Sequence, residues 1–155
     1  MKNQCPKSCK HRSILRIAPV CKGKIYVKPQ ASSCQMDLPL MEQVTCHPTK
    51  SSNQIARRFT QKHPDIHTRE TPRFSVRYTS PVDQEEQVYL YILPLNNEEE
   101  ISLAEGKFIS ANEIEAQPHL YSDYLQKESG LLGMAAELWE EYDSFKSSHG
   151  HQPSK

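Results

Sequence analysis

A basic helical face is the feature of this sequence that bears most directly on chemistry. The segment SNQIARRFTQKH (52–63) has the pattern of a helix, and Arg58, Gln61 and Lys62 lie in it at positions i, i+3 and i+4. Side chains at this spacing share one face of a helix. Arg57 adds a further cation beside them. Because guanidinium groups donate paired hydrogen bonds to phosphate oxygens, this segment predicts a site for an anionic ligand.

The same cations have a simpler explanation, which is that the helix face is solvated and binds nothing. Charged side chains usually point into water, so a basic face does not specify binding by itself. We keep both hypotheses and add Lys28 and Glu42 to the candidate ligand-binding residues. Glu42 is a carboxylate that precedes the helix in the sequence.

Carboxylates outside the helix could serve a different chemistry, in which they hold a divalent metal ion for hydrolysis. The candidates lie in strands, loops and charged segments: Glu42, Glu85, Glu86, Glu105 and Glu113. Oxygen ligands of this kind suit Mg²⁺. The alternative explanation is that these acids are simply solvated on the surface. An enzyme that uses these carboxylates is therefore a second functional hypothesis.

Cysteines near the N-terminus raise the possibility of a zinc site. Cys5, Cys9 and His11 lie close together, but the spacing is Cys-x3-Cys and the remaining cysteines are scattered. Structural zinc sites usually contain two compact ligand pairs. We therefore expect reduced thiols, with neither a metal site nor a disulfide framework.

The elements that must position these residues follow from the apolar patterns. Strands are predicted at 14–20, 24–29, 74–82 and 87–95, an extended segment at 35–44, a short strand from 107 that runs into a helix capped by Ser110, and helices at 52–63, 118–127 and 130–146. Gly23 supplies the turn between the first two strands. Strands interrupted by one helix and followed by others predict a sheet sandwiched by helices.

The helix at 130–146 has the clearest pattern, with Ser129 as its predicted N-cap. Its apolar stripe recurs every three or four residues: Leu131, Ala135, Leu138, Tyr142 and Phe145. Aromatic residues of the last two helices support a third hypothesis, a protein-interaction module with an exposed patch: Tyr121, Tyr124, Trp139 and Tyr142. The alternative is that these aromatics pack the helices onto the sheet.

Composition excludes several broad classes. The 155 residues contain 19 Lys and Arg against 19 Asp and Glu, so the net charge gives no reason to expect nucleic acid or an anionic membrane as a partner. No apolar run is long enough for a membrane span, and the N-terminus lacks the apolar stretch of a secretory signal. We expect a cytoplasmic protein with a flexible arm at 1–12, one domain at 13–146 and a disordered tail at 147–155.

The order of these segments resembles that of the Nudix hydrolase family over residues 13–127. ILRIAPVCKGKIYVKPQ is similar to the family's opening strand pair, and MDLPLMEQV stands where members carry W-x-L-P-G-G. IARRFTQKH stands where they carry R-E-U-x-E-E-x-G, with U aliphatic, and QVYLYILPL with EGKFISANEIE resembles a later strand and the step into a helix. The resemblance implies an α/β/α sandwich with a mixed sheet. It also implies hydrolysis of nucleoside diphosphate derivatives by Mg²⁺ held on glutamates of that helix.

The chain departs from the family motif where the metal would bind. Arg57 matches the family's arginine, but its three glutamate positions become Arg58, Gln61 and Lys62. The motif glycine becomes Pro64, and the double glycine becomes Leu40-Met41. A face with positive charge repels a divalent cation. We therefore expect a catalytically degenerate domain that binds a nucleotide or other diphosphate through this helix, with no cofactor unless the enzyme hypothesis holds.

Overall fold

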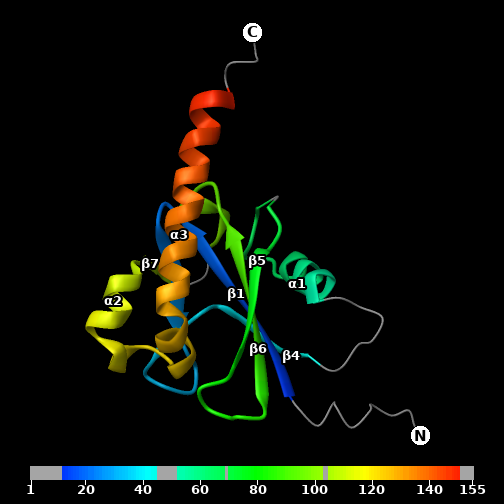
Figure 1. The fold of residues 1–155 in the computed structure, drawn as a ribbon, viewed down its shortest axis with the longest axis vertical. Helices are drawn as coiled ribbons and strands as arrows, with labels where there is room; N and C mark the ends of the chain where they lie inside the picture. The colour runs from blue at the N-terminus through cyan, green and yellow to red at the C-terminus, as the bar shows by residue number, and fades with distance from the viewer. Residues whose placement is uncertain (1–11, 45–51, 69, 103–104, 151–155) are drawn as a thin grey trace, which may run out of the picture.

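The computed structural model describes residues 12–44, 52–68, 70–102 and 105–150 (Figure 1). The expected N-terminal arm, with Cys5 and Cys9, lies outside these ranges except for its last residue. Within the described residues, no helix is long and apolar enough to cross a membrane.

A mixed seven-stranded sheet forms the centre of the domain. The strands are β1 (Arg12–Cys21), β2 (Lys24–Pro29), β3 (Met36–Asp37), β4 (Leu40–Val44), β5 (Arg73–Thr79), β6 (Glu86–Pro94) and β7 (Lys107–Ile109). Their order is β3-β2-β1-β6-β5, while β4 pairs with β1 and β7 pairs with β2. β1 and β6 are parallel, with Arg16 opposite Leu90, and the other pairs are antiparallel.

The turn between β1 and β2 confirms the predicted hairpin. Lys22 has φ 53° and Gly23 has φ 78°, so both central residues adopt the left-handed conformation of a tight two-residue turn. Gly23 carries no Cβ and accepts this conformation without strain. The hairpin fixes the register in which Val20 pairs with Ile25.

Helices cover both faces of the sheet. They are α1 (Ser52–Gln61), α2 (Ala111–Ala116) and α3 (Asp123–Gly150), with 3₁₀ turns at Glu98–Glu100 and Pro118–Leu120. Because side chains alternate along a strand, β6 supplies Leu90 and Ile92 to the core under α2 and α3, and Tyr91 and Leu93 to the core under α1. α3 crosses one face, α1 lies on the other (Figure 1), and the predicted α/β/α sandwich is confirmed.

The C-terminal helices differ from the prediction. The two helices expected at 118–127 and 130–146 are a 3₁₀ turn and one long helix, α3, which continues past residue 146 to Gly150. Ser129 does not cap a helix, because it lies inside α3 and its hydroxyl group donates to the carbonyl of Gln126. Ser122 takes the capping role instead, since its Oγ accepts from the N–H of Leu125 at 3.1 Å.

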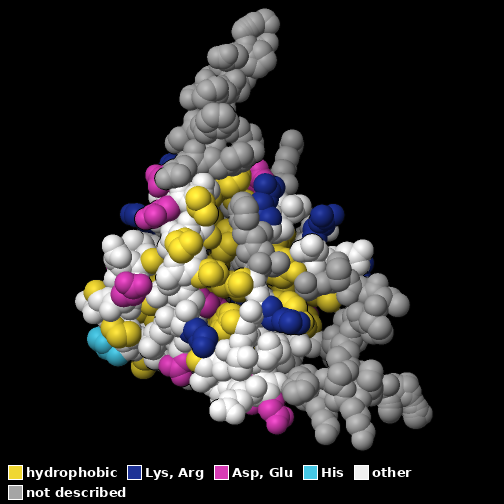
Figure 2. All heavy atoms as spheres, in the orientation of Figure 1, with side chains coloured by type: hydrophobic (Ala, Val, Ile, Leu, Met, Phe, Trp, Pro, Cys, Tyr) yellow, Lys and Arg dark blue, Asp and Glu magenta, His cyan; other side chains and the backbone are white. Residues whose placement is uncertain are grey.

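The apolar stripe predicted for α3 was wrong at Leu131 and Leu138, whereas its member Ala135 is partly buried and packs against the core. Leu131, Met134 and Leu138 are 40%, 62% and 59% exposed. Figure 2 shows hydrophobic side chains exposed on the face of the molecule that it views. The face that packs on the sheet consists of Leu125, Glu128, Leu132, Ala136 and Trp139, all buried. The exposed residues and the buried residues both recur at helical spacing. The buried face is hard to recognise in the sequence because it includes the charged residue Glu128. The side chains of Tyr142 and Phe145 lie outside the described part of the structure.

The aromatic residues follow the alternative explanation rather than the interaction-patch hypothesis. Tyr121 and Trp139 are 4% and 3% exposed and belong to the core under α3. Tyr124 is partly buried, and its ring stacks on the guanidinium group of Arg16. A contiguous exposed patch made by these three residues is therefore absent.

Candidate functional site

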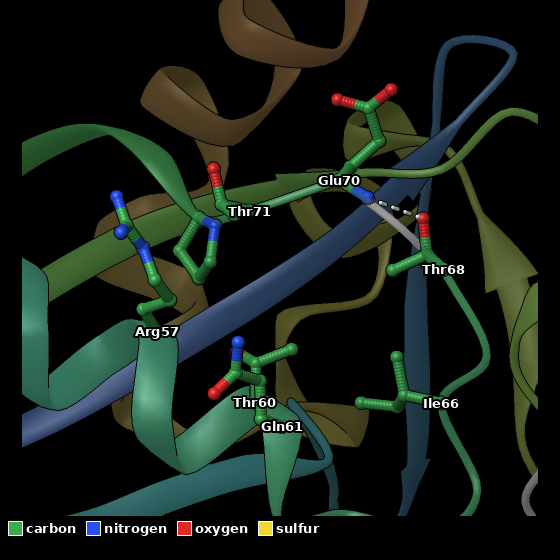
Figure 3. Close-up of a pocket in the computed structure, with 8 residues that line it drawn as sticks. Arg57, Thr60, Gln61, Ile66, Thr68, Glu70 and Thr71 are labelled. Atoms are coloured by element: carbon green, nitrogen blue, oxygen red, sulfur yellow. Dashed lines mark hydrogen bonds between the residues drawn. The ribbon is translucent and has the colours of Figure 1, made fainter.

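A pocket of about 370 Å³ lies between α1 and the segment 66–72 that leads into β5 (Figure 3). Among the residues that the structure describes, its lining is mostly polar and contains one cation: Arg57, Thr60, Gln61, Ile66, Thr68, Glu70, Thr71 and Pro72. Its size is near the lower end of the range for small-molecule sites, about 300–1,000 Å³. The pocket is therefore large enough for a small polar ligand.

The helix wall of the pocket is held by the core under α1. Ala56 is fully buried against the sheet, and Ile55 and Phe59 pack beside it. Thr60 is also buried, and its hydroxyl group donates to the carbonyl oxygen of Ala56 at 3.0 Å. The helix ends at Gln61, shortly before Pro64, which cannot continue a helix. These contacts fix the rotation of α1, and Arg57 and Gln61 come to line the pocket.

The facing wall is held by contacts to a distant part of the chain. Ile66 forms a β-bridge with Ile101, and the N–H of His67 donates to the carbonyl of Glu100 at 2.7 Å. The N–H of Ser102 donates to the carbonyl of Asp65 at 3.0 Å. These bonds bring a loop with no regular structure into a defined position opposite α1.

Glu70 lines the pocket, but its charge is engaged elsewhere. Its Oε1 accepts from Nη2 of Arg73 at 2.9 Å, and its carboxylate points away from Gln61 and Ile66 in Figure 3. Its backbone N–H donates to Oγ1 of Thr68 at 3.1 Å, which fixes the local turn. Among the described lining residues, Arg57 is therefore the main source of charge that is free to face a ligand.

The predicted ligand-binding residues separate into two groups. Arg57 and Gln61 line the pocket, whereas Arg58 and Lys62 are exposed and are not part of its lining. The reason is geometric, because the facing wall lies against the side of α1 that carries residues 57, 60 and 61. The positive charges of Arg58 and Lys62 still contribute to the electrostatic potential near the helix.

The two other predicted ligand residues lie apart from the pocket lining. Glu42 is exposed on β4, in register with Leu15. Lys28 is on β2, in register with Asp37 of β3. Sequence reasoning missed the facing wall entirely, because the segment 66–72 carries no periodic pattern that would connect it to α1.

The carboxylates of the enzyme hypothesis are distributed over separate elements. Glu85 lies in the exposed turn before β6, Glu105 in a loop with φ 67°, and Glu113 on α2, where it caps the helix with Ser110. Glu86 is buried. Across the described ranges, no group of three or more His, Cys, Asp or Glu residues is arranged to hold a metal ion.

A buried ionic network on the opposite face of the sheet was not predicted. Arg16 of β1 is fully buried, and its Nε and Nη2 donate to the two carboxylate oxygens of Glu128, both at 2.7 Å. Its Nη1 and Nη2 donate to Asp37 at 3.2 and 2.9 Å. The ring of Tyr124 stacks on the guanidinium group, with its centroid 4.7 Å from Cζ. Although burial lowers the pKa of Arg16, the charges of Glu128 and Asp37 raise it overall, so the group stays ionised.

Two tyrosine hydroxyl groups complete this network. Tyr78 donates to Oε2 of Glu128, and Tyr124 donates to Oε1 of Glu86 at 2.6 Å. Burial, reinforced by the charge of Glu128, raises the pKa of Tyr78. Burial and the hydrogen bond to Glu86 raise the pKa of Tyr124 to about 12. The network is closed by its own partners, so its geometry indicates a structural role.

Comparisons with known proteins identify the architecture. Neither the protein-family models nor the curated proteins give a match. Among solved structures, the Ap4A hydrolase of C. elegans matches with a TM-score of 0.54 and 18% identity, over 81% of this chain and 97% of that one. A Nudix family hydrolase from Clostridium perfringens matches with a TM-score of 0.52 and 11% identity, over 81% and 97%.

A third match is to a longer chain. A protein from Sinorhizobium meliloti has a TM-score of 0.56 and 12% identity over 83% of this chain, which spans only 41% of that one. At such identities the similarity concerns the fold. Together with the mixed sheet and its flanking helices, the matches to the two hydrolases show a Nudix-like α/β fold, as the sequence resemblance predicts.

Proposed function

We propose that this domain of Nudix-like fold binds a small phosphate-bearing ligand, of the nucleotide or diphosphate class, in the pocket beside α1. The observation that carries the proposal is that Arg57 lines a polar pocket on the helix that resembles the family's metal-binding helix. Its guanidinium group can donate two parallel hydrogen bonds to phosphate oxygens. Arg58 and Lys62 add positive potential from the neighbouring face of the same helix.

The donor set does not fit the Mg²⁺ ion that the fold family implies. Mg²⁺ prefers carboxylate and phosphate oxygens in octahedral geometry. Within the described part of its lining, the pocket has one carboxylate, that of Glu70, which is paired with Arg73 and points away from Gln61. The positions that resemble the family's glutamates hold Arg58, Gln61 and Lys62. The proposed ligand is therefore held by cationic and neutral donors, and no hydrolysis through a metal-bound water is proposed.

Calorimetric titration with pyrophosphate in the presence of a chelator tests this proposal. A charge-assisted hydrogen bond contributes about 1.5–3 kcal/mol, so Arg57→Gln should raise the Kd about tenfold to a hundredfold. The matched control is Arg77→Gln, because Arg77 is exposed on β5 and does not line the pocket. Its Kd should stay within about twofold of the wild-type value. Equal Kd values for wild type and both variants would contradict the proposal.

A further inference from the structure

The described lining of the pocket offers several hydroxyl and amide groups besides the guanidinium group of Arg57. Thr60 and Gln61 come from α1, and Thr68 and Thr71 come from the facing segment (Figure 3). A phosphate group needs hydrogen-bond donors alone, because its oxygens only accept when ionised. The remaining polar groups are therefore available to another part of the ligand.

Existing bonds determine what these groups offer to a ligand. The hydroxyl hydrogen of Thr60 is donated to the carbonyl of Ala56, so its oxygen is left as an acceptor. Oγ1 of Thr68 already accepts from the N–H of Glu70, so its hydroxyl hydrogen is left to donate. The amide of Gln61 offers both a donor and an acceptor. These pocket side chains together need a ligand that both donates and accepts hydrogen bonds. The hydroxyl groups of a ligand meet this need, since each hydroxyl group does both.

The apolar part of the lining is small. Ile66 and Pro72 provide aliphatic surface on the facing wall, and the pocket measures about 370 Å³. A sugar ring has an edge of hydroxyl groups and a face of C–H groups, so it satisfies both kinds of surface. A single phosphorylated sugar also agrees with a pocket near the small end of the usual range.

We infer that the organic part of the ligand is a sugar or similar polyol, so that the pocket takes a phosphorylated sugar. This inference rests on the proposed function, with the phosphate at Arg57 and the hydroxyl groups at Gln61 and Thr68. It defines the class of ligand more narrowly than the proposed function does.

Calorimetry on the full chain with four probes tests the inference: inorganic phosphate, ribose, ribose 5-phosphate and adenosine 5′-monophosphate. Ribose 5-phosphate should bind at least about tenfold more tightly than inorganic phosphate or ribose, because both halves of the site are used. Adenosine 5′-monophosphate should bind no more tightly than ribose 5-phosphate. Thr68→Val and Gln61→Leu should each weaken ribose 5-phosphate about threefold to tenfold, a larger loss than either variant causes for inorganic phosphate.

The outcomes separate the inference from the proposed function. Thr79→Val is the control, because Thr79 is exposed on β5 and is not part of the lining; its affinities should equal those of the wild type. Gln61 is exposed, so Gln61→Leu remains informative if Thr68→Val folds poorly. Equal affinities for inorganic phosphate and ribose 5-phosphate, or much tighter binding of adenosine 5′-monophosphate, would overturn the inference and leave the proposed function standing. Failure of every phosphate-bearing probe to bind, together with failure of pyrophosphate, would overturn both.

Discussion

The two faces of the sheet use arginine in opposite ways. Under α3, Arg16 is fully buried, and Glu128 and Asp37 occupy its donors in fixed geometry. Beside α1, Arg57 is exposed and borders a pocket. A buried charge must find its partners within the protein, whereas a charge at a pocket remains available to a ligand. The contrast supports our proposal that the face under α3 serves stability and that the face under α1 serves binding.

The largest effect that tests this contrast is expected from Glu128→Ala. This change leaves the buried charge of Arg16 with Asp37 alone, and breaking such a pair by removing one partner costs about 3–5 kcal/mol in the free energy of unfolding. Urea denaturation measures it. Two controls remove a charge from an exposed site: Glu137→Ala on the same helix and Arg57→Gln on the other face, each expected within about 0.5 kcal/mol. A similar loss of stability in Arg57→Gln and Glu128→Ala would remove the distinction between the faces.

A slightly smaller effect distinguishes the buried side of α3 from its exposed side. Leu132 is fully buried and Leu138 is 59% exposed. Leu132→Ala should therefore lower the free energy of unfolding by about 2–5 kcal/mol. Leu138→Ala should lower it by about 0.5 kcal/mol or less. The same urea measurement compares them, and a greater loss for Leu138 would restore the stripe that the sequence pattern favoured.

The smallest effect concerns alkaline pH and the tyrosines under α3. The pKa of Tyr124 rises from 10.0 to about 12 in the folded protein, through burial and its hydrogen bond to Glu86. The folded state therefore holds the proton more tightly, so this stabilisation is complete below pH 10 and is lost as the pH rises toward 12. Tyr124→Phe should lose less stability than the wild type between about pH 10 and about pH 12. Parallel urea midpoints in both proteins over this interval would contradict the assignment.

Much of the fold could be predicted from local patterns, and the main errors have one cause. Alternating apolar residues located β1, β2, β5 and β6, and Gly23 located the first turn. The error in α3 arises because Glu128, a charged residue, is in its buried face. Arg16 lies within the apolar segment ILRIAPV, and nothing nearby in sequence identifies its partners, since Glu128 is 112 residues away. Partners that meet only in the folded chain cannot be inferred from one segment.

The candidate site was predictable on one wall only. Arg57 and Gln61 follow from the helical pattern and from the family resemblance of α1. The facing wall depends on bonds from Asp65 and His67 to residues 100–102, which have no signature in the sequence. That wall selects the side of α1 that lines the pocket. A prediction from helical spacing alone therefore includes Arg58 and Lys62 in the site together with Gln61, although only Gln61 of these three lines the pocket.

The central claim is our proposal that the pocket beside α1 binds phosphate through Arg57 without a divalent metal. It is tested most directly by titrating the wild type with pyrophosphate, once with a chelator and once with Mg²⁺ in excess, while orthophosphate release is followed in the same samples. We expect saturable binding with Kd values that agree within about threefold, and no release of orthophosphate. Binding that requires Mg²⁺, or release of orthophosphate that starts when Mg²⁺ is added, would contradict the claim.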